Sequence, residues 1–142
     1  MRRLSRREML KRAAAAGAVA TVPPQVLAQA SGAEPYLNLT VAQAATLEAF
    51  VARLIPSDAG GPGAREAGAA RYIDGALGGA LAASRDAYNA GLAALDAHAE
   101  RSAGRKFAAL EPETQDALLR DLEANAVAGF TPDSLTFFNL VL

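Results

Sequence analysis

From residue 40 onward, large apolar side chains recur every three or four residues, which is the spacing of one face of an α-helix. The first such segment opens with a capping box, in which the Thr40 hydroxyl and the Gln43 side chain each bond a free backbone N–H group of the other residue. The helix is predicted to end at residue 55, because Pro56 disfavours helical geometry in the residue before it. Its apolar face consists of Leu47, Phe50, Val51 and Leu54.

Four more segments of the same kind follow, and their boundaries are set by glycine and proline. Gly104 and Gly129 are predicted to end two of them, Pro112 suits a first turn, and Thr131-Pro132 resembles an N-cap followed by a first-turn proline. The predicted helices span residues 64–77, 84–103, 112–128 and 131–142. The predicted apolar faces include Ala69, Tyr72, Ile73, Ala76 and Leu77 in the second helix and Leu135, Phe138 and Leu142 in the last. No alternating strand pattern occurs, so the fold class is all-α, a small irregular bundle of four to five short helices.

Composition sets limits on what such a bundle does. A chain of 142 residues suffices for one domain, and much of its apolar content is alanine, which forms helices well but fills a core poorly. A thin core of this kind leaves room for a partner surface. Residues after position 30 carry eight basic and fourteen acidic side chains, a net charge of −6, which argues against nucleic-acid binding. The absence of cysteine excludes disulfides, thiolate metal sites and a cysteine nucleophile.

The first thirty residues have the order of features found in a twin-arginine export signal. A basic start is followed by the apolar, uncharged residues 13–22, and Pro23-Pro24 then stops any helix. The apolar stretch is too short to span a bilayer, which takes about 20 residues. Cleavage is expected after Ala30, where Ala28 and Ala30 form the small-x-small pattern. The signal residues are Ser5, Arg6, Arg7, Leu10 and Lys11.

This signal divides the chain into a signal peptide at residues 1–30, a linker at 31–38 and a helical domain at 39–142. The twin-arginine route carries proteins that are already folded, often with a cofactor inserted. Nothing after residue 30 resembles a cofactor-binding motif. We therefore expect the signal to export a second protein bound to this chain.

Several features invite a chemical interpretation that the residue pattern does not favour. His98 is a single histidine without cysteine, so we expect it at a surface or interface and not at a metal or catalytic site. The glycine-rich loop at residues 60–63 lacks the Lys-Ser/Thr of a phosphate-binding loop and is predicted to be a structural turn. Regularly spread acids are typical of a solvated helix face: Glu111, Glu113, Asp116, Asp121 and Glu123. Aromatic side chains are predicted to lie in the core or at an interface: Tyr72, Tyr88, Phe107, Phe130, Phe137 and Phe138.

The helical domain also contains a set of short motifs that carry a family resemblance. They are Leu39-Thr40, Leu47-Glu48-Ala49, Arg53-Leu54-Ile55-Pro56, Gly61-Pro62-Gly63-Ala64-Arg65-Glu66-Ala67-Gly68, Tyr72-Ile73-Asp74, Tyr88, Gly91-Leu92-Ala93-Ala94-Leu95-Asp96, Phe107-Ala108-Ala109-Leu110 and Gln115-Asp116-Ala117-Leu118-Leu119. With these motifs the chain resembles the gluconate 2-dehydrogenase subunit 3 family over residues 39–142. The block from Ile55-Pro56 to Gly68 is the most specific part.

The resemblance implies a non-catalytic small subunit of a periplasmic, flavin-dependent dehydrogenase of sugars or sugar acids. It implies two partners: a large subunit of the glucose-methanol-choline type that holds FAD, and a cytochrome c with several haems. The twin-arginine translocase would be a third partner, and the complex would be held at the inner membrane. No catalytic, cofactor-binding or metal-binding residue is then expected in this chain. A free-standing periplasmic binding or structural protein remains an alternative, and an independent enzyme is a third class.

Two departures from the family pattern concern the later part of the chain. Relatives usually have serine or threonine at the position of Glu111, which is a poorer N-cap. They also continue past the Phe137-Phe138 pair into a longer tail. The apolar run at residues 137–142 therefore predicts either a truncated chain or an end that docks into a partner.

Overall fold

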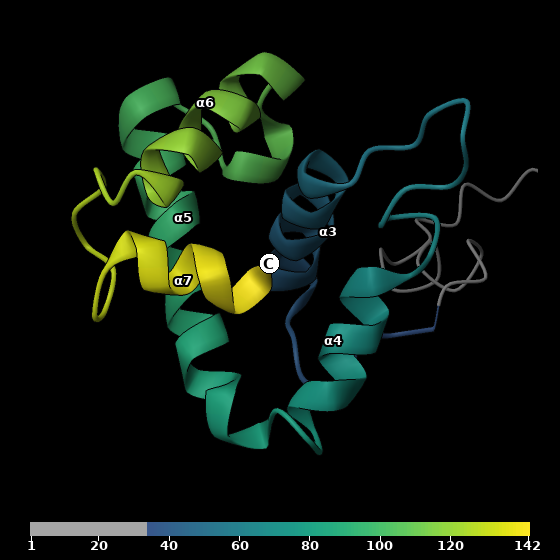
Figure 1. The fold of residues 1–142 in the computed structure, drawn as a ribbon. Coiled ribbons are helices and arrows are strands. Elements are labelled where there is room, and N and C mark those ends of the chain that lie inside the picture. Colours follow the sequence, from purple (N-terminus) through teal and green to yellow (C-terminus); the bar gives the residue numbers. More distant parts are fainter. Residues whose placement is uncertain (1–33) are drawn as a thin grey trace, which may run out of the picture. The chain divides into compact units, whose positions relative to one another are not determined.

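Residues 34–142 are described by a computed structural model (Figure 1). Within this range five α-helices, α3 to α7, and two short 3₁₀ helices follow one another, and no strand forms. The all-α prediction is thereby confirmed for the described residues, of which Tyr36–Leu142 form one unit. None of the helices in this part of the chain is both long enough and apolar enough to cross a membrane.

Helix α3 spans Val41–Leu54 and begins as the sequence predicts. The Thr40 hydroxyl accepts a hydrogen bond from the Gln43 backbone N–H at 3.2 Å, and the Gln43 side chain accepts one from the Thr40 N–H at 2.9 Å. These two bonds satisfy donors that the first turn of a helix cannot pair internally. Leu47, Phe50 and Val51 are buried, so the predicted apolar face is the one that packs.

Helix α4 spans Ala69–Leu77 and is shorter than predicted, since it begins at residue 69 and not at residue 64. Gly68 has a φ of 76°, in the left-handed region, and separates the turns before it from the helix. Glycine adopts this conformation without the steric cost that a side chain would add. Position 63 requires glycine for a different reason: a Cβ atom there would lie 2.5 Å from the Ile55 carbonyl oxygen.

Helices α5, Arg85–Ala103, and α6, Pro112–Glu123, confirm two of the predicted boundary signals. Gly104 ends α5 in the left-handed region with a φ of 75°, and Pro112 occupies the first turn of α6. The predicted end of α6 at Gly129 is wrong. The chain leaves the helix at residue 124, and Asn125 follows in the left-handed region with a φ of 54°.

The last helix, α7, spans Ser134–Val141, and its predicted N-cap is also wrong. Asp133 caps it, because its carboxylate accepts a hydrogen bond from the Thr136 N–H at 2.8 Å. Thr131 and Pro132 are joined by a cis peptide bond, and both precede the helix. The buried residues of α7 are Ser134, Phe137, Phe138 and Val141. Of the predicted face only Phe138 is therefore buried, and Leu135 and Leu142 are exposed.

The core is built around Phe50 of α3. Its ring lies 6.3 Å from Phe107, 5.9 Å from Phe137 and 5.9 Å from Phe138, measured between ring centroids. These contacts join α3 to the 3₁₀ helix Phe107–Ala109 and to α7, which runs across α5 in Figure 1. Tyr88, Phe107, Phe130, Phe137 and Phe138 are all buried, as predicted for the aromatic side chains, whereas Tyr72 is 79% exposed.

Candidate docking surface

A buried carboxylate on α4 holds the residues that precede α3. Asp74 is 4% exposed, and its side chain accepts hydrogen bonds from the backbone N–H groups of Leu37, Asn38 and Leu39 at 2.7, 2.8 and 2.9 Å. The Asn38 side-chain amide donates a fourth bond to the Asp74 carbonyl at 2.7 Å. We call Asp74 with residues 37–39 the junction clamp. It fixes residues that the sequence analysis assigned to the end of a linker.

Two further contacts support the junction clamp. The Tyr36 hydroxyl donates to the Glu48 carboxylate of α3, and the Arg71 guanidinium lies 4.8 Å above the centre of the Tyr36 ring. Burial, together with this bond to a carboxylate, raises the pKa of Tyr36 to about 12. Residues 36–39 are thus held by both α3 and α4.

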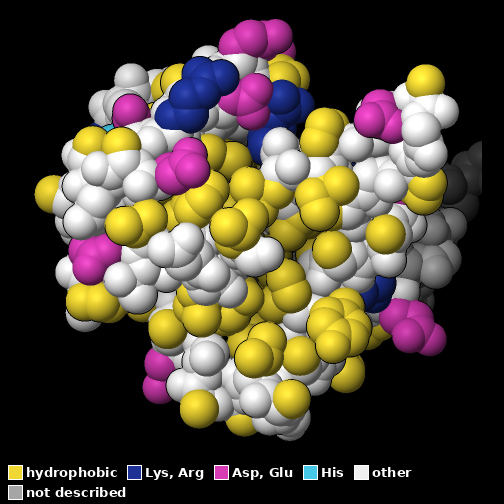
Figure 2. Space-filling model, in the orientation of Figure 1, with side chains coloured by type: hydrophobic (Ala, Val, Ile, Leu, Met, Phe, Trp, Pro, Cys, Tyr) yellow, Lys and Arg dark blue, Asp and Glu magenta, His cyan; other side chains and the backbone are white. Residues whose placement is uncertain are grey.

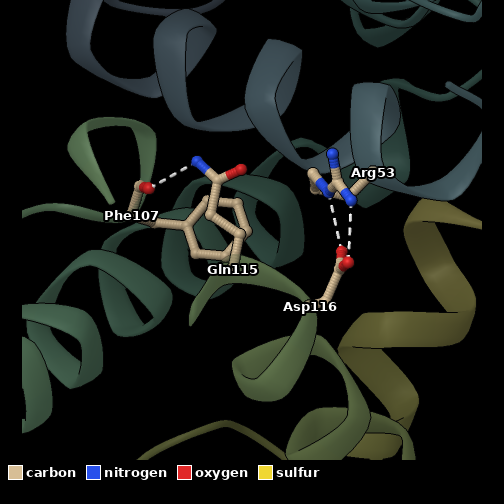
Figure 3. Close-up of polar contacts among 4 residues, drawn as sticks. All are labelled: Arg53, Phe107, Gln115 and Asp116. Carbon is tan, nitrogen blue, oxygen red and sulfur yellow. Dashed lines mark hydrogen bonds and ion pairs between the residues drawn. The ribbon is translucent and has the colours of Figure 1, made fainter. Parts of the chain in front are cut away.

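Helices α3 and α6 are joined by a paired ionic contact (Figure 3). Arg53 Nε and Nη2 each donate to one oxygen of Asp116 at 2.7 Å, so the two planar groups meet side by side. Beside this pair, the buried Gln115 amide donates to the Phe107 carbonyl at 2.9 Å. Asp116 is therefore part of a helix–helix contact, not of a purely solvated acidic face as the sequence pattern predicted.

The Arg53–Asp116 pair gives a testable pH dependence. Hydrogen bonding from Arg53 lowers the pKa of Asp116 from its ordinary value of 3.8, so the pair stabilises the fold fully above that value. The stabilisation is lost as the pH falls through the lowered pKa. We expect Asp116→Asn to reduce the free energy of unfolding at pH 7 by about 0.5–1 kcal/mol, since both side chains are partly exposed.

Urea unfolding of the wild type and the Asp116→Asn variant at pH 7 and at successively lower pH measures this effect. The difference between them should begin to shrink as the pH approaches 3.8 and continue to shrink below it. Asp121→Asn is the matched control, because Asp121 is an exposed acid on the same helix, and this change should stay within about 0.5 kcal/mol of the wild type. An equal loss in both variants would contradict a specific role for the pair.

An apolar groove of about 500 Å³ opens between α3, α4 and the C-terminal end of α7. In the view of Figure 1 the three helices meet near the end of α7, and Figure 2 shows hydrophobic side chains gathered there. We call this feature the α3–α4 groove. It is lined by Val51, Leu54, Ile55, Ala64, Ala67, Ala69, Tyr72, Ile73, Tyr88, Val141 and Leu142.

The orientation of α4 places Tyr72 at the groove. The sequence analysis placed Tyr72 on the apolar face of α4 with Ile73 and Leu77, but Leu77 is fully buried, Ile73 only packs against the edge of the core, and Tyr72 is exposed. Asp74 lies in the buried stripe between Ala70 and Leu77, and its carboxylate turns this side of α4 towards residues 37–39. The side of α4 that carries Tyr72 and Ile73 consequently forms a wall of the groove. An acid among apolar positions of a predicted helix was the sequence signal for the clamp, and sequence reasoning missed its role.

The other candidate residues are placed as follows. His98 is half-buried on α5, and its backbone carbonyl accepts a hydrogen bond from Ser102 Oγ at 2.8 Å. The loop at residues 60–63 closes as a turn in which the Gly63 N–H donates to Ser57 Oγ at 3.0 Å. Within residues 34–142, no group of three or more histidine, cysteine or acidic side chains is arranged to hold a metal ion.

The predicted export signal and cleavage site lie outside the described residues. This applies to Ser5, Arg6, Arg7, Leu10 and Lys11 of the signal and to Ala28 and Ala30 at the expected cleavage point. They remain predictions from the sequence.

Comparison with known proteins bears on the whole helical domain. Comparisons with curated proteins and with solved structures gave no match. A family model described as gluconate 2-dehydrogenase subunit 3 matches residues 41–142. Arg53, Gln115 and Asp116, which carried part of the resemblance, form the contacts between α3, α6 and Phe107 described above. Because the match covers well over half of the chain, the protein belongs to the gluconate 2-dehydrogenase subunit 3 family.

Proposed function

We propose that this chain is a non-catalytic accessory subunit that binds a folded flavin-dependent dehydrogenase and carries it through the twin-arginine route to the periplasm. The family description names a subunit of a dehydrogenase, which implies association with the other subunits. The observation that carries the proposal is the joining of a signal for folded cargo to this subunit domain. The domain itself supplies helix–helix contacts and an apolar groove.

The partners follow from the same proposal. The catalytic subunit would hold FAD and oxidise a sugar or sugar acid, and a cytochrome c subunit with haem would take the electrons and keep the complex at the inner membrane. This chain would contribute no residue to the redox chemistry. Its contribution is binding, folding assistance and export.

The junction clamp is consistent with such a carrier. Residues 37–39 are fixed to α4 by Asp74, so the folded body begins within a few residues of the predicted linker. A predicted signal at residues 1–30 is then followed closely by a fixed binding domain. This arrangement suits an export signal that is carried by a folded complex.

Changing the twin arginines to lysines tests the export role without altering charge. In cells that produce both subunits, Arg6→Lys with Arg7→Lys should move the flavoprotein from the periplasm to the cytoplasm, because the translocase reads the arginine pair. Fractionation followed by immunoblotting measures this shift. The matched control is Arg2→Lys with Arg3→Lys, which changes the same number of arginines outside the motif and should leave the flavoprotein periplasmic.

A flavoprotein that still reaches the periplasm with the altered pair, or after deletion of residues 1–30, would refute the export role. If the wild-type chain never co-purifies with the flavoprotein, the alternative of a free-standing periplasmic binding protein gains support.

A further inference from the structure

Exposed hydrophobic side chains are concentrated at the α3–α4 groove. Among the described residues, six large hydrophobic side chains are exposed, and three of them, Ile55, Tyr72 and Leu142, line this one groove. Ile55 is 62% exposed and Tyr72 is 79% exposed. Single exposed apolar residues are ordinary, but a contiguous group around a concave apolar surface is typical of an interaction site.

The charges restrict what the groove accepts. None of the eleven side chains that line it is charged, so a charged side chain inserted there would lose its hydration without gaining a partner. The chain after residue 30 carries a net charge of −6, and Figure 2 shows acidic side chains around the margin of the hydrophobic area, with some lysine or arginine side chains between them. An occupant that complements this surface is apolar where it enters and basic at its flanks.

The form of the groove favours a helix as occupant. It is lined mainly by α3 and by α4 with the turns before it, and Tyr88 of α5 and the end of α7 complete the lining. An amphipathic helix that lies in such a groove presents apolar side chains at three- and four-residue intervals. A volume of about 500 Å³ leaves room for only a few large side chains.

We infer that the α3–α4 groove is the docking site for an apolar helix face of the flavoprotein subunit, with basic residues beside the inserted side chains. This inference rests on the proposed function, in which the flavoprotein is the subunit that this chain binds and carries. The groove supplies the direct contact, and Tyr72 and Ile55 are its exposed apolar walls.

A charge placed in the groove should disrupt this contact. The Tyr72→Asp and Ile55→Asp variants should each lower the amount of affinity-tagged flavoprotein that co-purifies at equal expression by at least about tenfold, because a buried carboxylate would face apolar walls. Val41→Asp is the matched control: Val41 is 87% exposed but does not line the groove, so its variant should co-purify like the wild type. Thermal unfolding of all three variants checks that each is folded.

A second measurement does not depend on a disruptive charge. A photo-crosslinking phenylalanine analogue at position 72 should form a covalent adduct with the flavoprotein in the intact complex, and the same group at position 41 should not. Mass spectrometry of the adduct should locate it on a segment with apolar residues at helical spacing and lysine or arginine beside them.

The outcomes separate the inference from the proposed function. Equal co-purification of wild type, Tyr72→Asp and Ile55→Asp, with no adduct at position 72, would overturn the groove assignment while leaving the carrier role in place. An adduct to a second copy of this chain would also overturn it. Failure of the wild-type chain itself to bind the flavoprotein would overturn the carrier role as well.

Discussion

Replacing Asp74 by alanine is expected to lower the free energy of unfolding by about 3 kcal/mol. The change removes the acceptor of three backbone hydrogen bonds, from Leu37, Asn38 and Leu39. Leu39 is buried, so its N–H group would lose its partner where water does not readily replace it. Urea unfolding followed by circular dichroism measures the loss.

Two variants calibrate this prediction. Asp74→Asn keeps one carbonyl oxygen and should give an intermediate loss, whereas Asp121→Ala removes an exposed acid and should change stability by less than about 0.5 kcal/mol. Hydrogen exchange should also show faster exchange of the amides of residues 37–39 in Asp74→Ala. Wild-type stability and unchanged exchange in this variant would mean that the carboxylate does not hold the junction.

The second large effect is expected at Gly91 of α5, where α7 packs against the helix. A Cβ atom at Gly91 would lie 2.0 Å from Cδ2 and 2.2 Å from Cε2 of Phe137, far inside van der Waals contact. Gly91→Ala should therefore force α5 and α7 apart and reduce the free energy of unfolding by about 2–3 kcal/mol. The expected loss exceeds the helix-propensity gain of about 1 kcal/mol that alanine brings.

Gly75 of α4 provides a control of opposite sign. It also lies within a helix, but a Cβ atom there would meet no heavy atom within 4 Å. Gly75→Ala should stabilise the protein by about 0.5–1 kcal/mol, because it adds helix propensity without a clash. Differential scanning calorimetry of both variants should show shifts of the melting temperature in opposite directions. A rise in both would place α7 elsewhere than against Gly91.

Sequence patterns correctly predicted the helix ends that are determined by contacts between residues a few positions apart. The capping box at Thr40 and the glycine at position 104 fixed the start of α3 and the end of α5, because each satisfies backbone groups close by in sequence. The same reasoning failed at Gly129 and Thr131. There, the Asn125 side-chain oxygen accepts hydrogen bonds from Ser134 and Leu135, a contact between segments that no local pattern reveals.

The two parts of the candidate site were predictable to different extents. The apolar side of α4, with the exposed Tyr72 and the partly buried Ile73, was visible in the sequence as an apolar stripe, but whether that stripe is covered depends on which way the helix is turned. Asp74 decides this by binding residues 37–39, which lie some 35 positions earlier. A periodic pattern gives the faces of a helix, not the neighbour that each face meets.

The sequence by itself determined that the domain after the first thirty residues is all-α, that those thirty residues have the pattern of an export signal and that residues 39–142 resemble a dehydrogenase subunit. These conclusions need only spacing, capping and residue type, which act over a few neighbouring positions. The tertiary structure alone decided that Asp74 fixes the start of the folded body, that Arg53 pairs with Asp116 and that an uncharged groove opens between α3 and α4. Each of these joins segments that lie far apart along the chain, and such contacts are hidden from local patterns.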